Sequence, residues 1–223
     1  LKPDTLIKFK VIDDNSSDKN LKKLKDLINT HGIDCEIINH DKSEHKEKIA
    51  AENNQETFGN LSSLLKCFEV AKKDQSDLIY FVEDDYLHYE HSLVDMLNTY
   101  ERVSSQHKDE IIVCPSDYPF NYMNNEKTNI LIGSQQHWRT ITKMLCTFMI
   151  SKKMFQKHIE NFDKTCEKRH EPFEKYLNKI LESEIGISPI KSLAIHMTNV
   201  NSSYGLSPFI DIKKLWEENK IRQ

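Results

Sequence analysis

The chain has 223 residues, enough for one sizeable hydrophobic core and a single α/β domain. Its 31 basic and 35 acidic residues give a formal net charge of −4, which provides no general attraction to nucleic acid or to an anionic membrane surface. The 5 cysteines are odd in number and widely spaced, which predicts reduced thiols rather than disulfides or a zinc site. No stretch is long and apolar enough to span a membrane and no signal peptide is visible, so we expect a cytoplasmic protein.

The first part of the chain predicts a strand that ends in acidic residues. Residues 7–12 are mostly apolar and run directly into Asp13-Asp14-Asn15-Ser16-Ser17-Asp18. Leucines and isoleucines at helical spacing then predict a helix over 20–31, followed by a short strand over 34–38. The highly charged segment 42–55 is predicted to be a surface loop or a short exposed helix.

A second acidic strand end is the most informative feature of the sequence. After a helix predicted over 59–73, five apolar residues at 78–82 are followed by Glu83, Asp84 and Asp85. Such an apolar run is typical of a buried strand in a parallel sheet, and open α/β sheets bind ligands beyond the carboxyl ends of their strands. Three adjacent carboxylates repel one another unless a cation lies among them, which favours a divalent metal ion with oxygen ligands. The alternative is a strand that ends in a solvated acidic turn.

Strands and helices alternate through the rest of the chain. Apolar runs predict strands over 110–115, 144–151 and 190–196, whereas helical spacing predicts helices over 89–102 and 207–216. This alternation predicts a mostly parallel sheet flanked by helices.

Two polar segments in the second half offer contacts to a ligand. The loop 116–122 combines Asp117 with four ring residues, which could form the wall of a sugar or base site or could pin the loop itself. Arg139 follows Trp138 and could make a bidentate contact to a phosphate. The alternative for this pair is a structural Trp138 with Arg139 stacked or ion-paired.

The two acidic strand ends, VIDDNSSD and FVEDDY, resemble in content and order those of the nucleotide-sugar-dependent glycosyltransferases of the GT-A fold, particularly family 2. The resemblance implies an α/β, GT-A-like (Rossmann-like) fold with a mostly parallel sheet. The first strand of that fold is either missing or lies upstream of Leu1. We therefore expect a single domain over 1–223 that is part of a longer protein.

The resemblance also implies roles for the acidic residues. Asp13 and Asp14 would contact the nucleotide. Asp85 would hold a divalent metal, Mn²⁺ or Mg²⁺, on the donor diphosphate. Asp84 or Glu83 would support this binding, and Asp84 would contact the donor. Arg139 would add positive charge to the diphosphate.

The last two predicted roles fall on later residues. Several GT-A enzymes place a late histidine on the same metal, so His196 at the end of the last predicted strand becomes the second ligand; a hydrogen-bonded structural histidine is the alternative. The family's catalytic base is an acid that opens a helix, and here His170-Glu171-Pro172 takes its place, which assigns the base to Glu171. Glu171 could instead be only a helix N-terminal acid, and the remaining candidates for the base are Asp117, Asp163 and Glu174.

The predicted function is the metal-dependent, inverting transfer of a sugar from a nucleotide-sugar donor to an acceptor hydroxyl, such as that of a glycan. Bacterial surface polysaccharide synthesis, in the cytoplasm or peripherally at the inner membrane, is the expected setting. Neither nucleic acid nor a transmembrane segment is expected, and the sequence does not indicate an oligomeric state. Two alternatives stay open: a non-catalytic module that binds a sugar or nucleotide, and a nucleotidyltransferase, although the 5 glycines are isolated and form no phosphate loop.

Overall fold

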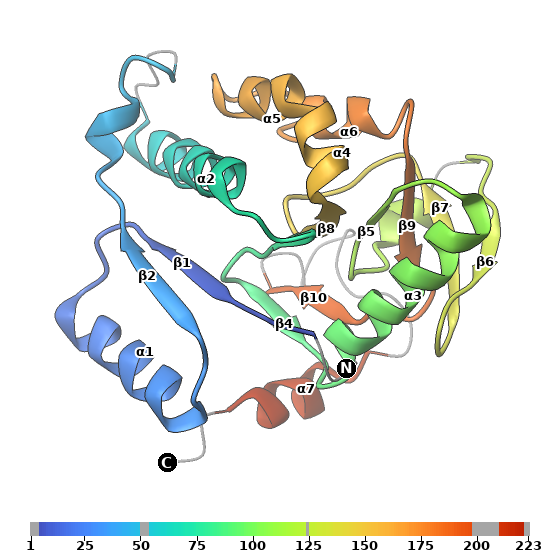
Figure 1. Cartoon of the computed structure of the whole chain (residues 1–223), viewed down its shortest axis with the longest axis horizontal. Coiled ribbons are helices and arrows are strands. Elements are labelled where there is room, and N and C mark those ends of the chain that lie inside the picture. Colours follow the sequence, from blue (N-terminus) through green and yellow to red (C-terminus); the bar gives the residue numbers. More distant parts are fainter. Residues whose placement is uncertain (1–4, 50–53, 124, 198–209, 221–223) are drawn as a thin grey trace. The chain divides into compact units, whose positions relative to one another are not determined.

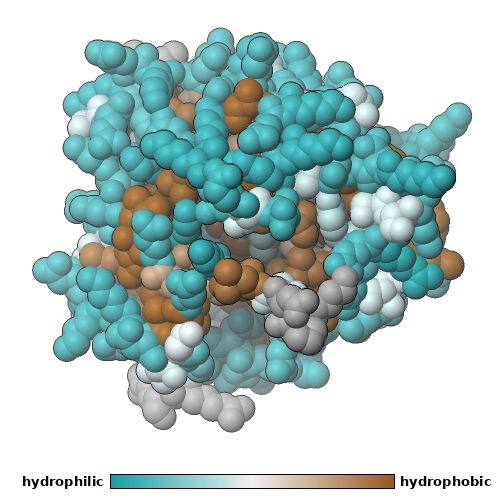
Figure 2. All heavy atoms as spheres, in the orientation of Figure 1, coloured by the Kyte–Doolittle hydropathy of each residue, from teal (hydrophilic) through white to brown (hydrophobic). Residues whose placement is uncertain are grey.

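The computed structural model describes residues 5–49, 54–123, 125–197 and 210–220. The chain forms two compact units, each described here by itself. The first contains Leu1–Asp74 and Phe162–Phe173, and the second contains Gln75–Asn161 and Glu174–Gln223. Hydrophilic residues make up most of the face shown in Figure 2, with hydrophobic residues in smaller areas between them.

The first unit is built on two parallel strands, β1 (Phe9–Asp13) and β2 (Cys35–Asn39), which the helix α1 (Asp18–His31) connects (Figure 1). Both strands and the helix confirm the sequence prediction. Gly32 ends the helix with a φ of 60°, a left-handed conformation that suits glycine. Because the two strands are parallel and end in register, the residues that follow them leave the pair at the same edge. The unit also contains the 3₁₀ helix η1 (Lys42–His45), the helix α2 (Gln55–Lys73) and the end of α5 (Ile159–Cys166).

The helix α2 provides the buried face of the first unit. It contacts β1, and its residues Leu61, Leu65 and Phe68 are buried. The ring of Phe68 meets that of Phe162 edge to face, with 5.1 Å between centroids. The helix begins earlier than the sequence predicts because the Asn54 side chain accepts hydrogen bonds from the first backbone N–H groups.

The second unit contains a mixed six-stranded sheet in the order β3-β8-β5-β9-β7-β6. Only the pair β5 and β9 is parallel; the other neighbours in this order are antiparallel. The α/β class is confirmed, but the prediction of a mostly parallel sheet is wrong, because an apolar run does not determine the direction of the neighbouring strand. The strands are β3 (Leu78–Phe81), β5 (Ile111–Val113), β6 (Ile130–Ile132), β7 (His137–Ile141), β8 (Phe148–Ser151) and β9 (Ile185–Pro189).

The strands β4 (Tyr86–His88) and β10 (Ala194–His196) form a separate antiparallel pair. β4 begins directly after the acidic residues 83–85, and β10 ends at His196. Helix α3 packs against β5, α4 against β8 and α7 against β4. The start of the last predicted helix, at 207–209, lies outside the described residues. The helices of this unit are α3 (Ser92–His107), η2 (Pro119–Tyr122), α4 (Lys152–Lys157), α6 (Lys175–Ile180) and α7 (Ile212–Asn219).

The core of the second unit lies between the sheet and α3. Trp138 is fully buried there, and a Cβ atom on Gly133 would lie 2.2 Å from Trp138 Cδ1, so glycine is required at that position. Among the described residues, no helix is both long and apolar enough to cross a membrane. The buried residues of this cluster are Met96, Val103, Ile111, Val113, Trp138, Met149, Ile187 and Leu193.

Candidate functional site

The strand pair β4 and β10 brings Glu83, Asp85 and His196 together. His196 is the last residue of β10 and is paired in register with Tyr86, the residue after Asp85. The Nε2 atom of His196 lies 2.8 Å from Asp85 Oδ2. Each of the three residues offers one ligand atom, and these atoms lie within 4.8 Å of one another, a spacing that could hold a metal ion. The sequence predicted Asp85 and His196 as ligands, and the structure places them side by side.

Neighbouring rings fix the orientation of the His196 imidazole. Tyr86 stacks on His196 with 4.8 Å between ring centroids and an interplanar angle of 13°. Tyr86 is itself buried, and its hydroxyl hydrogen-bonds with that of Tyr118. The imidazole therefore stacks on a buried aromatic ring while its Nε2 atom lies beside the Asp85 carboxylate.

Burial and the charges of nearby acids raise the pKa of Glu83 to about 7. Burial is the largest cause, followed by the charges of Asp85 and Glu174, while a hydrogen bond with Thr147 opposes them. A cation among these groups would relieve both the repulsion and the lack of solvation. Asp84 is exposed and does not belong to the three-residue group found among the described residues, so the structure associates Glu83 rather than Asp84 with Asp85.

The candidate bases occupy different surroundings. Glu171 belongs to the first unit, its side chain is 87% exposed, and its Oε1 lies 3.7 Å from Arg169 Nε. Helix α6 begins only at Lys175, so neither Glu171 nor Pro172 lies in its first turn. Glu174 caps that helix in the second unit, close enough to Glu83 to raise its pKa, and burial raises the pKa of Glu174 itself.

The other two candidates for the base are engaged in ion pairs. Asp163 Oδ1 lies 2.6 Å from Lys72 Nζ in the first unit. Asp117 is buried in the second unit, where its Oδ1 lies 3.7 Å from Arg139 Nη2 and its Oδ2 accepts a hydrogen bond from Tyr122. Burial raises the pKa of Asp117 to about 6, although Tyr122 and Arg139 lower it.

Arg139 is held by protein groups in this structure. Its guanidinium lies over the ring of Tyr122, 4.0 Å from the centroid, in addition to the ion pair with Asp117. This is the stacked and ion-paired arrangement that the sequence left as the alternative to a phosphate contact. Asp117 and His196 are both among the residues that line one small cavity.

The predicted nucleotide motif lies at the carboxyl edge of β1 in the first unit. Both oxygens of Asp13 accept from the backbone N–H of Ser16, at 3.4 and 3.3 Å, so this carboxylate closes the turn after the strand. Asp14 Oδ2 lies 3.3 Å from Lys42 Nζ. Asp13 is therefore bound within its own turn, and Asp14 is ion-paired with Lys42.

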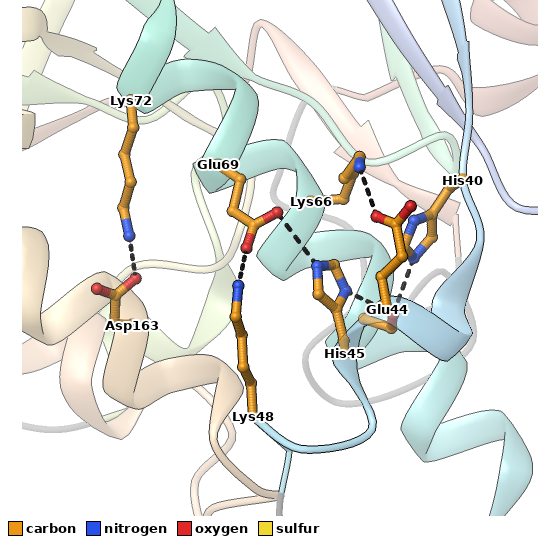
Figure 3. Close-up of polar contacts among 9 residues, drawn as sticks. His40, Glu44, His45, Lys48, Lys66, Glu69, Lys72 and Asp163 are labelled. Atoms are coloured by element: carbon orange, nitrogen blue, oxygen red, sulfur yellow. Dashed lines mark hydrogen bonds and ion pairs between the residues drawn. The ribbon is translucent and has the colours of Figure 1, made fainter.

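Sequence reasoning missed a polar group in the first unit. His45 and Ile49 are buried, although the segment 42–55 was predicted to be exposed. His45 contacts Ser62 of α2, as does His40 directly after β2 (Figure 3). A histidine two residues after the predicted strand 34–38 was the signal for His40, but the charge of the segment concealed His45.

Comparison with protein-family models and with curated proteins finds no match for this chain.

Proposed function

We propose that the protein is a metal-dependent glycosyltransferase that moves a sugar from a nucleoside diphosphate donor to an acceptor hydroxyl. The observation that carries the proposal is the group of Glu83, Asp85 and His196, whose ligand atoms lie within 4.8 Å of one another directly after an apolar strand. The order of the two acidic motifs, in which VIDDNSSD precedes FVEDDY, supports the same class through its resemblance to GT-A enzymes.

The donor atoms of the site favour Mn²⁺ over Mg²⁺. Two carboxylates and an imidazole are present, and imidazole suits transition metals, whereas Mg²⁺ prefers oxygen ligands and retains its water. Asp85 and His196 would hold the ion, with Glu83 as the third ligand. When bound, the ion would supply positive charge to the donor diphosphate and stabilise the leaving group.

The protein's own groups would carry out the remaining steps. A carboxylate removes the proton from the acceptor hydroxyl as it attacks the anomeric carbon, which gives inversion. Glu171 is the base that the resemblance implies, and Glu174 is a second candidate because its charge raises the pKa of Glu83 within the second unit. The nucleoside contacts of Asp13 and Asp14 and the donor contact of Asp84 are those that the resemblance implies. Synthesis of a bacterial surface glycan in the cytoplasm, or at the inner membrane, remains the proposed setting.

Product analysis tests the proposal. The protein is incubated with a panel of nucleotide sugars and Mn²⁺, with and without hydroxyl acceptors, and the released nucleotide is identified. Acceptor-dependent release of nucleoside diphosphate that stops with EDTA and in Asp85→Ala is expected. Glu90→Ala is the matched control, because Glu90 is an exposed acid of the same unit to which no role in the site is assigned. Release of pyrophosphate would replace the proposal with nucleotidyl transfer, and binding without turnover would replace it with a binding module.

A further inference from the structure

Strand β6 lies at one end of the six-stranded sheet, and among the described strands it pairs with β7 alone (Figure 1). Residues 125–130 and Ile132 are exposed, whereas Leu131 is partly buried. The edge of β6 that faces away from β7 is therefore uncovered in the described part of the chain. An edge of this kind can pair with a further strand.

The hydrogen bonds to β7 determine which backbone groups of β6 point outward. Asn129 O accepts a backbone hydrogen bond from β7, and Gly133 N donates one to the residue before β7, each at 3.0 Å. In an antiparallel pair, bonding to one neighbour alternates along the strand, so Leu131, midway between these two residues, also faces β7. The N–H and C=O groups of Ile130 and Ile132 therefore point away from β7, toward the open edge.

This edge strand carries exposed apolar side chains on one face. Ile130 and Ile132 are two residues apart, so their side chains lie on the same face of the sheet, and the two residues are 57% and 61% exposed. Arg139 is opposite Ile130 in the register with β7, and its guanidinium lies over the ring of Tyr122, which is also exposed. Burial of this apolar surface against a second strand would be favourable.

The edge lacks the residues that usually prevent strand pairing. Proteins protect their edge strands with charged side chains or proline, among other devices. Residues 128–136 contain no charged residue and no proline. Before this segment, Glu126 Oε1 lies 3.5 Å from Lys143 Nζ, so the charge of Glu126 is compensated within the chain. An incoming strand would therefore meet an apolar edge without charge repulsion.

We propose that two copies of this chain associate through β6 as antiparallel strands, with a two-fold axis at Leu131. In this register Ile130 is opposite Ile132 of the partner subunit, and each such pair exchanges two backbone hydrogen bonds. The edge is complementary to itself, since its outward groups are placed symmetrically about Leu131 and apolar side chains meet apolar ones. No like charges meet, because the axis places the two copies of Lys127 at opposite ends of the paired segment.

The size of this contact sets how strong the association can be. Ser134 N donates to Thr99 Oγ1 within the chain, which limits the paired segment to residues 129–133. Interfaces this small bury less than about 1,200 Å², the range of weak and reversible association. We therefore expect a dimer with a Kd between about 10 μM and about 1 mM, which forms only at high protein concentration.

Sedimentation equilibrium of the full chain tests the proposal over this concentration range. The average mass should rise from that of a monomer toward that of a dimer. Ile132→Lys should weaken the association about tenfold or more, because it places a charge opposite an apolar side chain. Trp216→Lys is the matched control, since Trp216 is 50% exposed on α7 of the same unit and should leave the association unchanged. A monomer throughout the range, or an equal loss in both variants, overturns the proposal.

Amide hydrogen exchange distinguishes strand pairing from any other contact between copies. The amides of Ile130 and Ile132 point outward, so their exchange should slow as the protein concentration rises, whereas that of Leu131, already directed to β7, should change little. A dimer without this alternation would use another surface and would also overturn the proposal. The test involves neither a nucleotide nor a metal ion, so its outcome is separate from that of the proposed function.

Discussion

His196 Nε2 lies 2.8 Å from Asp85 Oδ2, although the two residues are far apart in the sequence. The antiparallel pair β4 and β10 creates this contact, since His196 is in register with Tyr86. In the absence of a cation, the imidazole and the carboxylate are partners. A metal ion would take both as ligands.

We therefore expect His196→Ala to weaken Mn²⁺ binding in the presence of a nucleoside diphosphate while the protein stays folded. The loss should exceed the roughly 10- to 100-fold effect of removing a group outside the ligand set. Titration calorimetry measures it, with His137→Ala, an exposed histidine on β7, as the control. Unchanged metal affinity in His196→Ala would make this histidine a structural residue.

The base should be found by separating binding from chemistry. We expect Glu174→Gln to retain donor and metal affinity but to lose roughly a hundredfold or more in turnover, the usual effect of removing a general base. Glu174 is favoured because it lies close enough to Glu83 for its charge to raise the pKa of Glu83. Glu171→Gln is the matched comparison, and a selective loss of turnover there would instead confirm the assignment that the resemblance implies. Initial rates and donor affinities for both variants, and for Asp163→Asn and Asp117→Asn, decide among the four.

The hydroxyl of Ser62, which contacts both His40 and His45, should contribute to stability. Ser62→Ala leaves two buried imidazole nitrogens without their partner, at a cost of about 1–3 kcal/mol in the free energy of unfolding. Urea unfolding measures the difference. Ser63→Ala, at the next and less buried position of α2, should change stability by less than about 0.5 kcal/mol. An equal effect of both substitutions would mean that the hydroxyl contributes little beyond helix propensity.

Asp117 should make stability depend on pH in a defined window. Its pKa is raised from 3.8 to about 6 by burial, so between these values the folded protein holds a proton that the unfolded chain has lost. This contribution is fully present below pH 3.8 and is lost as the pH rises through about 6.

Asp117→Asn removes this titration. The free energy of unfolding of the wild type, minus that of the variant, should therefore fall between pH 4 and 6, by at most about 1.4 kcal/mol per pH unit. Urea unfolding at several pH values measures this difference, and Asp84→Asn serves as the exposed control. A difference that does not vary with pH would show that burial of Asp117 has little effect on its titration.

The sequence was informative about which side chains meet at the strand ends and less so about the sheet. The proximity of Asp85 and His196 could be predicted because each stands at the end of an apolar run, and strand ends are where side chains of different segments meet. The direction of β3 could not be predicted, since its apolar residues suit an antiparallel neighbour equally well. β9 was missed because Gly186, Ser188 and Pro189 interrupt its apolar pattern.

The polar contacts of the first unit required tertiary information. The sequence of 42–55 gives a high charge and little apolar content, which predicts exposure. In the fold, His45 is nevertheless buried because it meets Ser62 and Glu69 on one face of α2. No local pattern reports that contact, since it depends on where the chain lies after β2. Arg139 illustrates the same limit: its two possible roles differ only in whether Asp117 and Tyr122 are its neighbours.

The pairing of β4 with β10 also couples ligand binding to local opening of the chain. A cation held by Asp85 and His196 can bind only while these two strands are paired, so by mass action it would stabilise the pair relative to any state in which β10 has detached. Hydrogen exchange at Ile195 and His196 would then slow as the metal concentration rises. The concentration of the ion would thereby set how long β10 stays in place.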